Sequence, residues 1–122
     1  MAKVLVIDDD FNVTELLRSI LERENLEVIA AKDGKEGIEA YKTNGADLVI
    51  TDIIMPEKEG LETIMELRKI NPEVIIIAMS GGGRAGPWNY LETAKKFGAN
   101  KVFTKPFDRK EMVSSIKELL SI

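Results

Sequence analysis

The sequence predicts an α/β protein in which five parallel strands form one sheet, doubly wound, with helices on both faces. Short runs of branched apolar residues, of the length of a buried parallel strand, alternate with amphipathic segments of helical period. The chain has 122 residues, enough for one domain with a substantial core and too few for two. Five repeats of strand and helix, joined by right-handed crossovers, give this (βα)5 architecture.

The predicted strands are the most apolar runs of the chain. The first, VLVI, leads directly into three consecutive aspartates. The fourth, EVIIIAMS, is the most apolar, so we expect it near the centre of the sheet. The five strands cover residues 4–7, 26–31, 46–52, 73–80 and 101–104.

The predicted helices follow these strands in turn, over residues 11–25, 33–45, 59–72, 87–98 and 108–122. The first carries an apolar stripe at helical spacing, formed by Val13, Leu16, Leu17, Ile20 and Leu21. The second places Ile38 and Tyr41 inward and stops at Gly45.

The remaining helices show the same pattern. The third presents an apolar face formed by Leu61, Ile64, Met65 and the stem of Arg68. The fourth begins with Pro87 in its first turn and ends at Gly98. The fifth is capped by Asp108 and has an inward face formed by Met112, Val113, Ile116, Leu119 and Leu120.

The composition excludes several kinds of chemistry. A net charge of −4, with both signs mixed along the chain, argues against direct binding of nucleic acid. The absence of cysteine removes disulfides, thiolate nucleophiles and cysteine zinc sites. The absence of histidine removes the commonest general base and the commonest transition-metal ligand. Any bound metal must therefore have oxygen ligands, which favours Mg²⁺, Mn²⁺ or Ca²⁺.

The N-terminal segment MAKVLVIDDD has the features of neither a signal peptide nor a transit peptide. No later apolar run is long enough to span a bilayer. We therefore expect a cytoplasmic protein without membrane contact.

Polar residues follow four of the five predicted strands. In open parallel sheets, ligands bind outside the carboxyl ends of the strands, near the point where the strand order reverses. This rule selects six candidate residues: Asp8, Asp9, Asp10, Asp52, Ser80 and Lys105.

The chemistry of these residues suits phosphoryl transfer. Carboxylates crowded at one edge raise one another's pKa unless a cation relieves the repulsion, so they predict a Mg²⁺ site. One carboxylate oxygen can then attack phosphorus and form an aspartyl phosphate. A lysine and a serine hydroxyl can bind the phosphoryl oxygens, and such a transfer requires positioning and charge neutralisation more than a base.

Four segments, VLVIDDD, LVITDIIMP, AMSG and VFTKPF, resemble the receiver domains of bacterial two-component response regulators in order and spacing. The resemblance covers essentially the whole chain. It implies the flavodoxin-like receiver fold with strand order 2-1-3-4-5. It also implies a single receiver domain over residues 1–122 with no output domain, although a receiver from a longer regulator stays open.

The resemblance assigns roles to the acidic residues. Asp52 corresponds to the phosphoacceptor, and Asp8 with Asp9 to the acidic pair that holds Mg²⁺, with Mn²⁺ as a possible substitute. Asp52 itself and the backbone carbonyl of Ile54 complete the implied metal ligands. Asp10 lies one position further and is expected to cap the first helix.

The resemblance also identifies the expected switch residues. Ser80 occupies the switch position, and Lys105 corresponds to the lysine that meets the phosphoryl group. Pro106 is expected to follow a cis peptide bond. Receivers usually carry an aromatic residue three positions before the lysine, where this chain has Val102. The aromatic residue here is Phe103, on the opposite face of the strand, so we expect a weaker or different conformational signal.

Receivers take their phosphoryl group from the phosphohistidine of a sensor histidine kinase or a histidine phosphotransfer protein. The resemblance therefore implies such a donor, and a downstream protein target that contacts the fourth helix, fifth strand and fifth helix. Monomer and phosphorylation-dependent dimer are both compatible with it. It implies a switch that dephosphorylates itself, not a turnover enzyme. Because neither Ile54 nor Gly82 can position an attacking water, we expect that dephosphorylation to be slow.

Two other functions stay open on the sequence alone. Gly81, Gly83 and Gly86 have the G-x-G-x-x-G spacing of a dinucleotide-binding loop, although they follow the fourth strand instead of the first. The fold also hosts flavin-binding and nucleotide-binding modules. The second alternative is a Mg²⁺-dependent phosphatase with an aspartyl-phosphate intermediate, which would need a general acid near Asp52.

Overall fold

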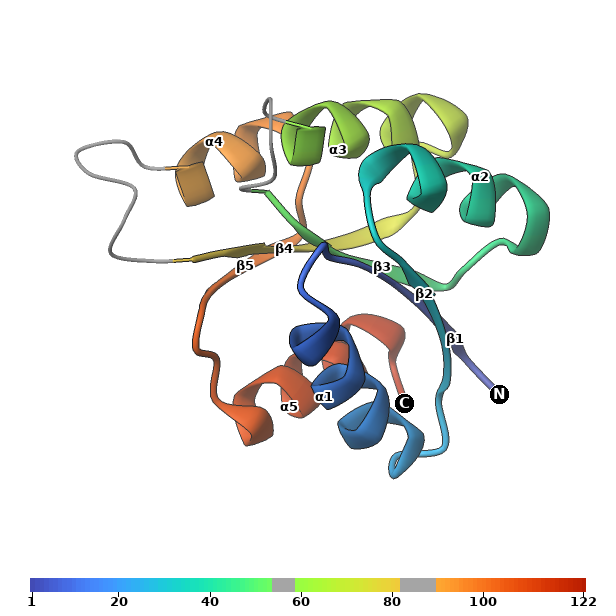
Figure 1. The fold of residues 1–122 in the computed structure, drawn as a ribbon, viewed down its shortest axis with the longest axis vertical. Coiled ribbons are helices and arrows are strands. Elements are labelled where there is room, and N and C mark those ends of the chain that lie inside the picture. The colour runs from blue at the N-terminus through green and yellow to red at the C-terminus, as the bar shows by residue number, and fades with distance from the viewer. Residues whose placement is uncertain (54–58, 82–89) are drawn as a thin grey trace.

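The computed structural model describes residues 1–53, 59–81 and 90–122. Within these residues, five parallel strands form one sheet in the order β2-β1-β3-β4-β5, which confirms the predicted topology (Figure 1). The strands are β1 (Lys3–Ile7), β2 (Glu27–Ala31), β3 (Leu48–Asp52), β4 (Ile75–Ser80) and β5 (Lys101–Thr104). The helices are α1 (Phe11–Glu22), α2 (Gly34–Asn44), α3 (Glu59–Ile70), α4 (Tyr90–Phe97) and α5 (Arg109–Leu120).

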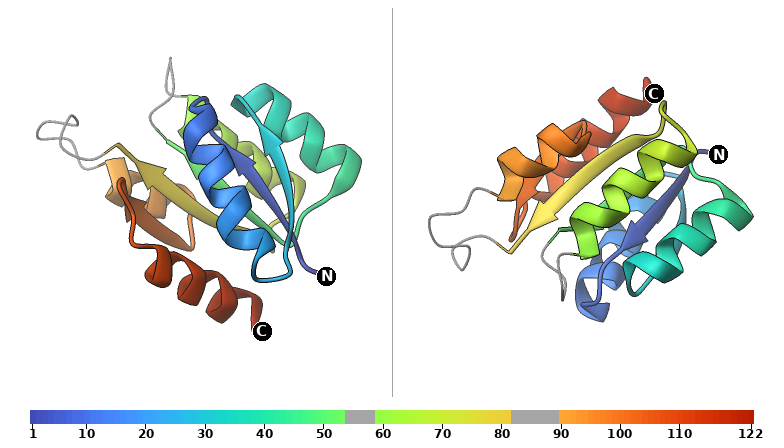
Figure 2. Two further views of the ribbon diagram at one scale, coloured as in Figure 1. Left: turned by 60° about the horizontal axis from the view of Figure 1, so that its bottom comes forward. Right: turned by 90° about the horizontal axis from the view of Figure 1, so that it is seen from above.

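The helices form two layers, one on each face of the sheet. Helices α2, α3 and α4 lie side by side on one face, and α1 and α5 lie on the other (Figures 1 and 2). Alternate residues of β1 point into the two layers: Leu5 and Ile7 pack beneath α2 and α3, whereas Val4 and Val6 pack against α1 and α5. Both faces of the sheet are therefore buried, which explains why the strands are continuous apolar runs.

Aspartates define the starts of three helices. The carboxylate of Asp10 accepts a hydrogen bond from the N–H of Asn12 at the start of α1. Asp33 caps α2 and Asp108 caps α5 in the same manner, through the N–H groups three residues further on. The predicted caps at Asp10 and Asp108 are confirmed, as is the stop of α2 at Gly45, which has a φ of 69°.

The prediction of the buried helix faces is wrong for two residues. Leu16 is 45% exposed and Met65 is 44% exposed. Each lies in the middle of its helix but outside the buried stripe, which includes Leu17 in α1 and Leu67 in α3, both fully buried. Periodicity identified the side of each helix correctly but overestimated the width of the buried stripe.

Arg68, near the end of α3, connects two loops at the amino ends of β4 and β5. Its Nε and Nη2 donate to the carbonyl of Gly98 at 3.1 and 2.6 Å, and Nη2 also donates to Oδ1 of Asn100 at 2.7 Å. Its Nη1 donates to the carbonyl oxygens of Pro72, at 3.1 Å, and Val74. One side chain thus fixes the connections that lead into both strands.

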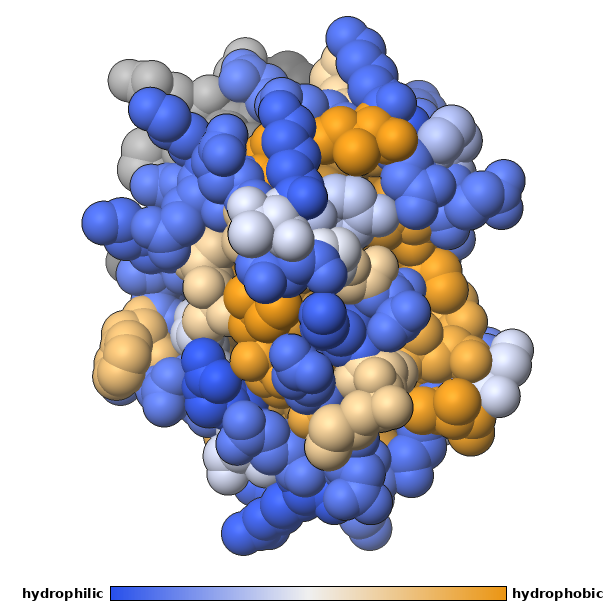
Figure 3. Space-filling model, turned by 90° about the vertical axis from the view of Figure 1, so that its right-hand side faces the viewer, coloured by the Kyte–Doolittle hydropathy of each residue, from blue (hydrophilic) through white to orange (hydrophobic). Residues whose placement is uncertain are grey.

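Hydrophilic side chains cover most of the face seen in Figure 3 and separate its hydrophobic groups from one another. In the parts of the chain that the structure describes, no helix combines the length and the apolar character needed to span a membrane.

Candidate phosphoryl-acceptor site

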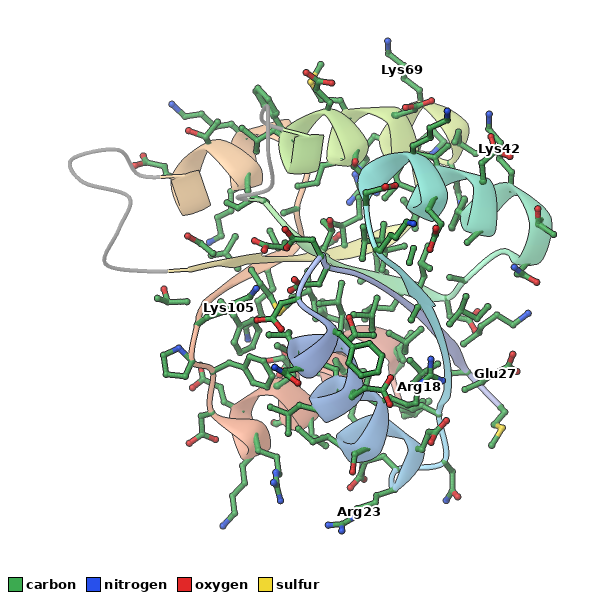
Figure 4. The ribbon with its side chains drawn as sticks, in the orientation of Figure 1. Arg18, Arg23, Glu27, Lys42, Lys69 and Lys105 are labelled. Atoms are coloured by element: carbon green, nitrogen blue, oxygen red, sulfur yellow. The ribbon has the colours of Figure 1, made fainter. Side chains whose placement is uncertain are left out.

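The carboxyl end of the sheet brings together three charged residues from distant parts of the chain. Asp8 follows β1, Asp52 is the last residue of β3, and Lys105 follows β5. The Lys105 ammonium lies 2.7 Å from Oδ2 of Asp8 and 3.1 Å from Oδ2 of Asp52. Figure 4 shows the Lys105 side chain at the end of β5, turned toward the ends of the central strands.

These groups differ in their contact with solvent. Asp8 and Asp52 are only 2% and 5% exposed, whereas the side chain of Lys105 is 18% exposed. Asp9 is exposed, yet one carboxylate oxygen from each of Asp8, Asp9 and Asp52 lies within 4.8 Å of the others. The site is therefore a partly buried acidic cluster that is open to solvent on the side of Asp9.

Burial and charge shift two pKa values in this cluster. Burial raises the pKa of Asp8, because the hydrogen bonds from Lys105 and from the N–H of Asp10 offset only part of the lost hydration. Burial alone would lower the pKa of Lys105, but its hydrogen bond to Asp8 and the negative charges of Asp52 and Asp8 raise it above its ordinary value. Lys105 therefore stays charged as the resident cation of the cluster.

The donor set fits a hard divalent cation. Three carboxylates minus one ammonium leave two negative charges in excess when all groups are ionised. A divalent ion would balance this excess, and oxygen is the ligand that Mg²⁺ and Mn²⁺ prefer. Asp8, Asp9 and Asp52 are the described residues that could hold it.

The three consecutive aspartates serve different local purposes. The N–H of Asp8 continues the sheet by donating to the carbonyl of Ala31 at 3.1 Å. The Oδ1 of Asp8 accepts from the N–H of Asp10 at 2.8 Å, which turns the chain away from the strand. Asp10 then caps α1, as described above. Asp9 is exposed at the rim of the cluster. The three aspartates therefore place one carboxylate inside the cluster (Asp8), one at its rim (Asp9) and one at the start of α1 (Asp10).

Ser80 ends β4 beside Lys105. It is buried, it faces Thr104 in the β4–β5 register, and its carbonyl accepts from the N–H of Lys105 at 2.7 Å. The Lys105–Pro106 peptide bond is cis. The backbone ladder therefore continues past the end of β5 and holds Lys105 next to the predicted switch serine.

Val102 and Phe103 lie on opposite faces of β5, as predicted. Val102 packs at the edge of the core beneath α2, α3 and α4. Phe103 is buried in the other core, with residues of α1 and α5. The side of the sheet where receivers carry their aromatic residue therefore has a valine here.

Two residues close to Asp52 were missed by the sequence analysis. Gly60, in the first turn of α3, lies so close to the end of β3 that a Cβ atom there would be 2.4 Å from the carbonyl oxygen of Asp52. The hydroxyl of Thr51 donates to the same oxygen at 3.1 Å. A glycine inside a predicted helix is unfavourable and was the available signal, but the sequence does not show what the glycine contacts.

Several predicted features lie outside the described residues. These are the metal-binding carbonyl of Ile54, the position of Gly82, the glycines at 83 and 86 of the proposed dinucleotide loop, and Pro87 at the predicted start of the fourth helix.

Comparisons with known proteins agree with this geometry. The family model described as response regulator receiver domain matches residues 4–117. The chemotaxis protein CheY of Halobacterium salinarum is 35% identical, over 99% of this chain and 99% of its own length. A crystal structure of a response regulator receiver domain protein from Clostridium thermocellum has a TM-score of 0.88 at 30% identity, covering 99% of this chain and 95% of that one. The chain therefore belongs to the response regulator receiver domain family, whose members are phosphoryl-accepting signalling domains.

Other relatives are longer. The transcriptional regulatory protein CpxR of Klebsiella pneumoniae is 33% identical over 98% of this chain, which corresponds to 50% of CpxR. The chain thus spans about half the length of this curated relative and nearly the whole of the Halobacterium protein.

Proposed function

We propose that this chain is a signalling switch that accepts a phosphoryl group on Asp52 in a Mg²⁺-dependent reaction. The donor is a phosphohistidine of a sensor histidine kinase or of a histidine phosphotransfer protein. The observation that carries the proposal is the contact of one ammonium group, that of Lys105, with two buried carboxylates at neighbouring strand ends. Phosphoryl transfer needs an oxygen nucleophile held in position and a positive charge held next to it.

In the transfer, a carboxylate oxygen of Asp52 forms a bond to phosphorus while the phosphorus–nitrogen bond of the donor histidine breaks. The donor imidazole leaves with the electron pair of that bond. Asp8, Asp9 and Asp52 would hold Mg²⁺, with Ile54 contributing its carbonyl as the family resemblance implies. Bound Mg²⁺ would supply positive charge to the oxygens of the transferred group.

Lys105 and Ser80 act on the product. The Lys105 ammonium already lies at the Asp52 carboxylate, so it is placed to bind phosphoryl oxygens once Asp52 has been modified. Ser80, at the adjacent strand end, donates its hydroxyl to another phosphoryl oxygen. The shift of this hydroxyl biases the arrangement of α4 and β5, and partners read the change on the α4–β5–α5 face.

The output of the switch goes through protein contacts, with a downstream protein or with a second copy after phosphorylation, and not through direct contact with nucleic acid or membrane. The chain works in the cytoplasm, where its donors are. It resets by slow hydrolysis of the aspartyl phosphate and is not a turnover enzyme.

The test is the intact mass of the protein after incubation with acetyl phosphate, with Mg²⁺ or with a chelator. The control variants are Asp52→Asn and Asp10→Asn, because Asp10 belongs to the same acidic run but caps a helix, and Asn caps equally well. We expect one Mg²⁺-dependent phosphoryl adduct on the wild type and on Asp10→Asn, and none on Asp52→Asn. An adduct that persists in Asp52→Asn, or one that forms equally well in chelator, would contradict the proposal.

A further inference from the structure

The first turn of α3 rests directly on the backbone that carries Asp52. A Cβ atom at Gly60 would lie 2.4 Å from the Asp52 carbonyl oxygen, 2.4 Å from Cα of Ile53 and 2.9 Å from its carbonyl carbon. All three contacts are with backbone atoms, which cannot rotate away as the end of a side chain can. Any larger residue at position 60 must therefore displace either α3 or the Asp52–Ile53 peptide.

Two hydrogen bonds hold the same peptide from other directions. The hydroxyl of Thr51, which is fully buried, donates to the Asp52 carbonyl at 3.1 Å. The N–H of Ile53 donates to the carbonyl of Met79 in β4 at 2.9 Å. The peptide is thus fixed at its oxygen, at its nitrogen and on the side that faces Gly60.

We infer that Gly60 and Thr51 are positioning residues for Asp52. They fix the peptide that follows the acceptor, and so fix the direction in which the Asp52 carboxylate points toward Asp8 and Lys105. The inference rests on the proposed function of Asp52 and adds to it a requirement for a side chain of minimal size at position 60.

The displacement caused by a methyl group at Gly60 falls on the acceptor. Contacts of a real Cβ atom lie at 3.0 Å or more, so the 2.4 Å contact must lengthen by at least the difference. Helix α3 resists the movement because Ile64 and Leu67 are fully buried and Arg68 is hydrogen-bonded at its far end. A displacement of this size at a reacting group is enough to slow a reaction strongly, since a misplacement of about 1 Å can cost about 100-fold.

The test compares Gly60→Ala with Gly37→Ala. Gly37 is also a tightly packed helical glycine, but a Cβ atom there would meet only side-chain atoms of Ile7, with Cδ1 at 2.4 Å and Cγ1 at 2.7 Å. Both variants crowd a tight contact with an added methyl group, and only the first displaces backbone at the acceptor. Thermal unfolding first establishes a temperature at which each variant is folded.

Two readouts then separate positioning from stability. Mn²⁺ affinity is measured by water proton relaxation, without phosphodonor. The rate of phosphorylation is measured by intact mass, with acetyl phosphate at saturating Mg²⁺. For folded Gly60→Ala we expect Mn²⁺ binding about fivefold weaker and phosphorylation at least about tenfold slower than wild type, and for Gly37→Ala both values within about twofold.

Gly60→Ala that matches the wild type in both readouts would overturn the inference and leave the proposed function intact. A wild type that fails to bind Mn²⁺ or to form the Asp52 adduct would overturn the proposed function and the inference with it. If Gly60→Ala does not fold, the decision passes to Thr51→Val, which keeps the shape of the side chain and removes its hydrogen bond. Thr51→Val should show a smaller loss in the same two readouts, and unchanged values would overturn the inference.

Discussion

The ammonium of Lys105 lies 2.7 Å from Oδ2 of Asp8, although the two residues are 97 positions apart in the chain. The same ammonium reaches Asp52, 53 positions away, at 3.1 Å. The acidic cluster is therefore complete only when β1, β3 and β5 occupy one sheet. Its charge balance depends on a residue that directly follows the last strand.

Replacing Lys105 by Met should destabilise the metal-free protein. The change leaves Asp8 and Asp52 buried side by side without their cation, and breaking a buried pair in this way costs about 3 kcal/mol. We expect Mg²⁺ to recover more stability in this variant than in the wild type, because the metal supplies the missing charge. Urea unfolding with chelator and with Mg²⁺ measures both effects. Lys110→Met, at an exposed position of α5, is the matched control, with an expected change within about 0.5 kcal/mol.

Asp8→Asn should stabilise the metal-free protein at neutral pH. Burial raises the pKa of Asp8 in the folded state, so the folded protein binds this proton more tightly than the unfolded chain does. The associated stability is fully present below about pH 4 and is lost as the pH rises through the folded pKa. The advantage of Asn over Asp should therefore grow as the pH rises from about 4 through the folded pKa of Asp8.

Urea unfolding in chelator over this pH range tests the Asp8 prediction. A stability difference that stays constant with pH would contradict it. Addition of Mg²⁺ should stabilise the wild type more than Asp8→Asn, since the variant has one carboxylate charge fewer in the cluster.

Ile54→Asn should shorten the lifetime of the phosphorylated protein. In receivers, the residues two positions after the acceptor and after the switch hydroxyl tune this lifetime, and here they are Ile54 and Gly82. An amide at position 54 can orient water, an effect that we expect to accelerate hydrolysis up to about tenfold. The decay of the adduct after removal of acetyl phosphate measures the rate. Ile54→Val should keep the slow rate, and an Ile54→Asn variant that decays no faster than the wild type would refute the role of Ile54.

Phosphorylation should change α4 and β5 only slightly. Val102 occupies the side of β5 where receivers usually carry an aromatic residue, while Phe103 is buried on the other side. Amide hydrogen exchange with and without Mg²⁺ and beryllofluoride, a phosphoryl mimic, measures the response of both elements. A large loss of protection there in the wild type would contradict the prediction. Val102→Tyr should enlarge the response, and Phe103→Leu, on the opposite face, should not.

The sequence was sufficient to predict most of the sheet and the end of the sheet at which the acidic cluster lies. β5 was predicted over its observed range because KVFT is bounded by turn residues and Lys-Pro. Asp8, Asp52, Ser80 and Lys105 lie at the same end of the sheet because every parallel strand ends there, so strand assignment alone brought them together. The chemical roles given to them remain predictions.

The missed contacts involve partners that no local pattern encodes. Leu16 and Met65 are exposed because of the orientation of each helix relative to the sheet, and the spacing of apolar residues does not give that orientation. The requirement for Gly60 arises where the start of α3 meets the end of β3. The sequence predicted only that the stem of Arg68 packs on the apolar face of its helix. It did not indicate the hydrogen bonds of the guanidinium to Gly98, 30 positions further along the chain, and to Pro72 nearby.

The Arg68 arrangement makes the two ends of the sheet chemically different. At the amino end, the guanidinium of Arg68 holds neutral carbonyl and amide oxygens. At the carboxyl end, two carboxylates and an ammonium hold one another. The proposed metal and phosphoryl group would therefore act at the carboxyl end, on the far side of the sheet from the neutral oxygens that Arg68 holds.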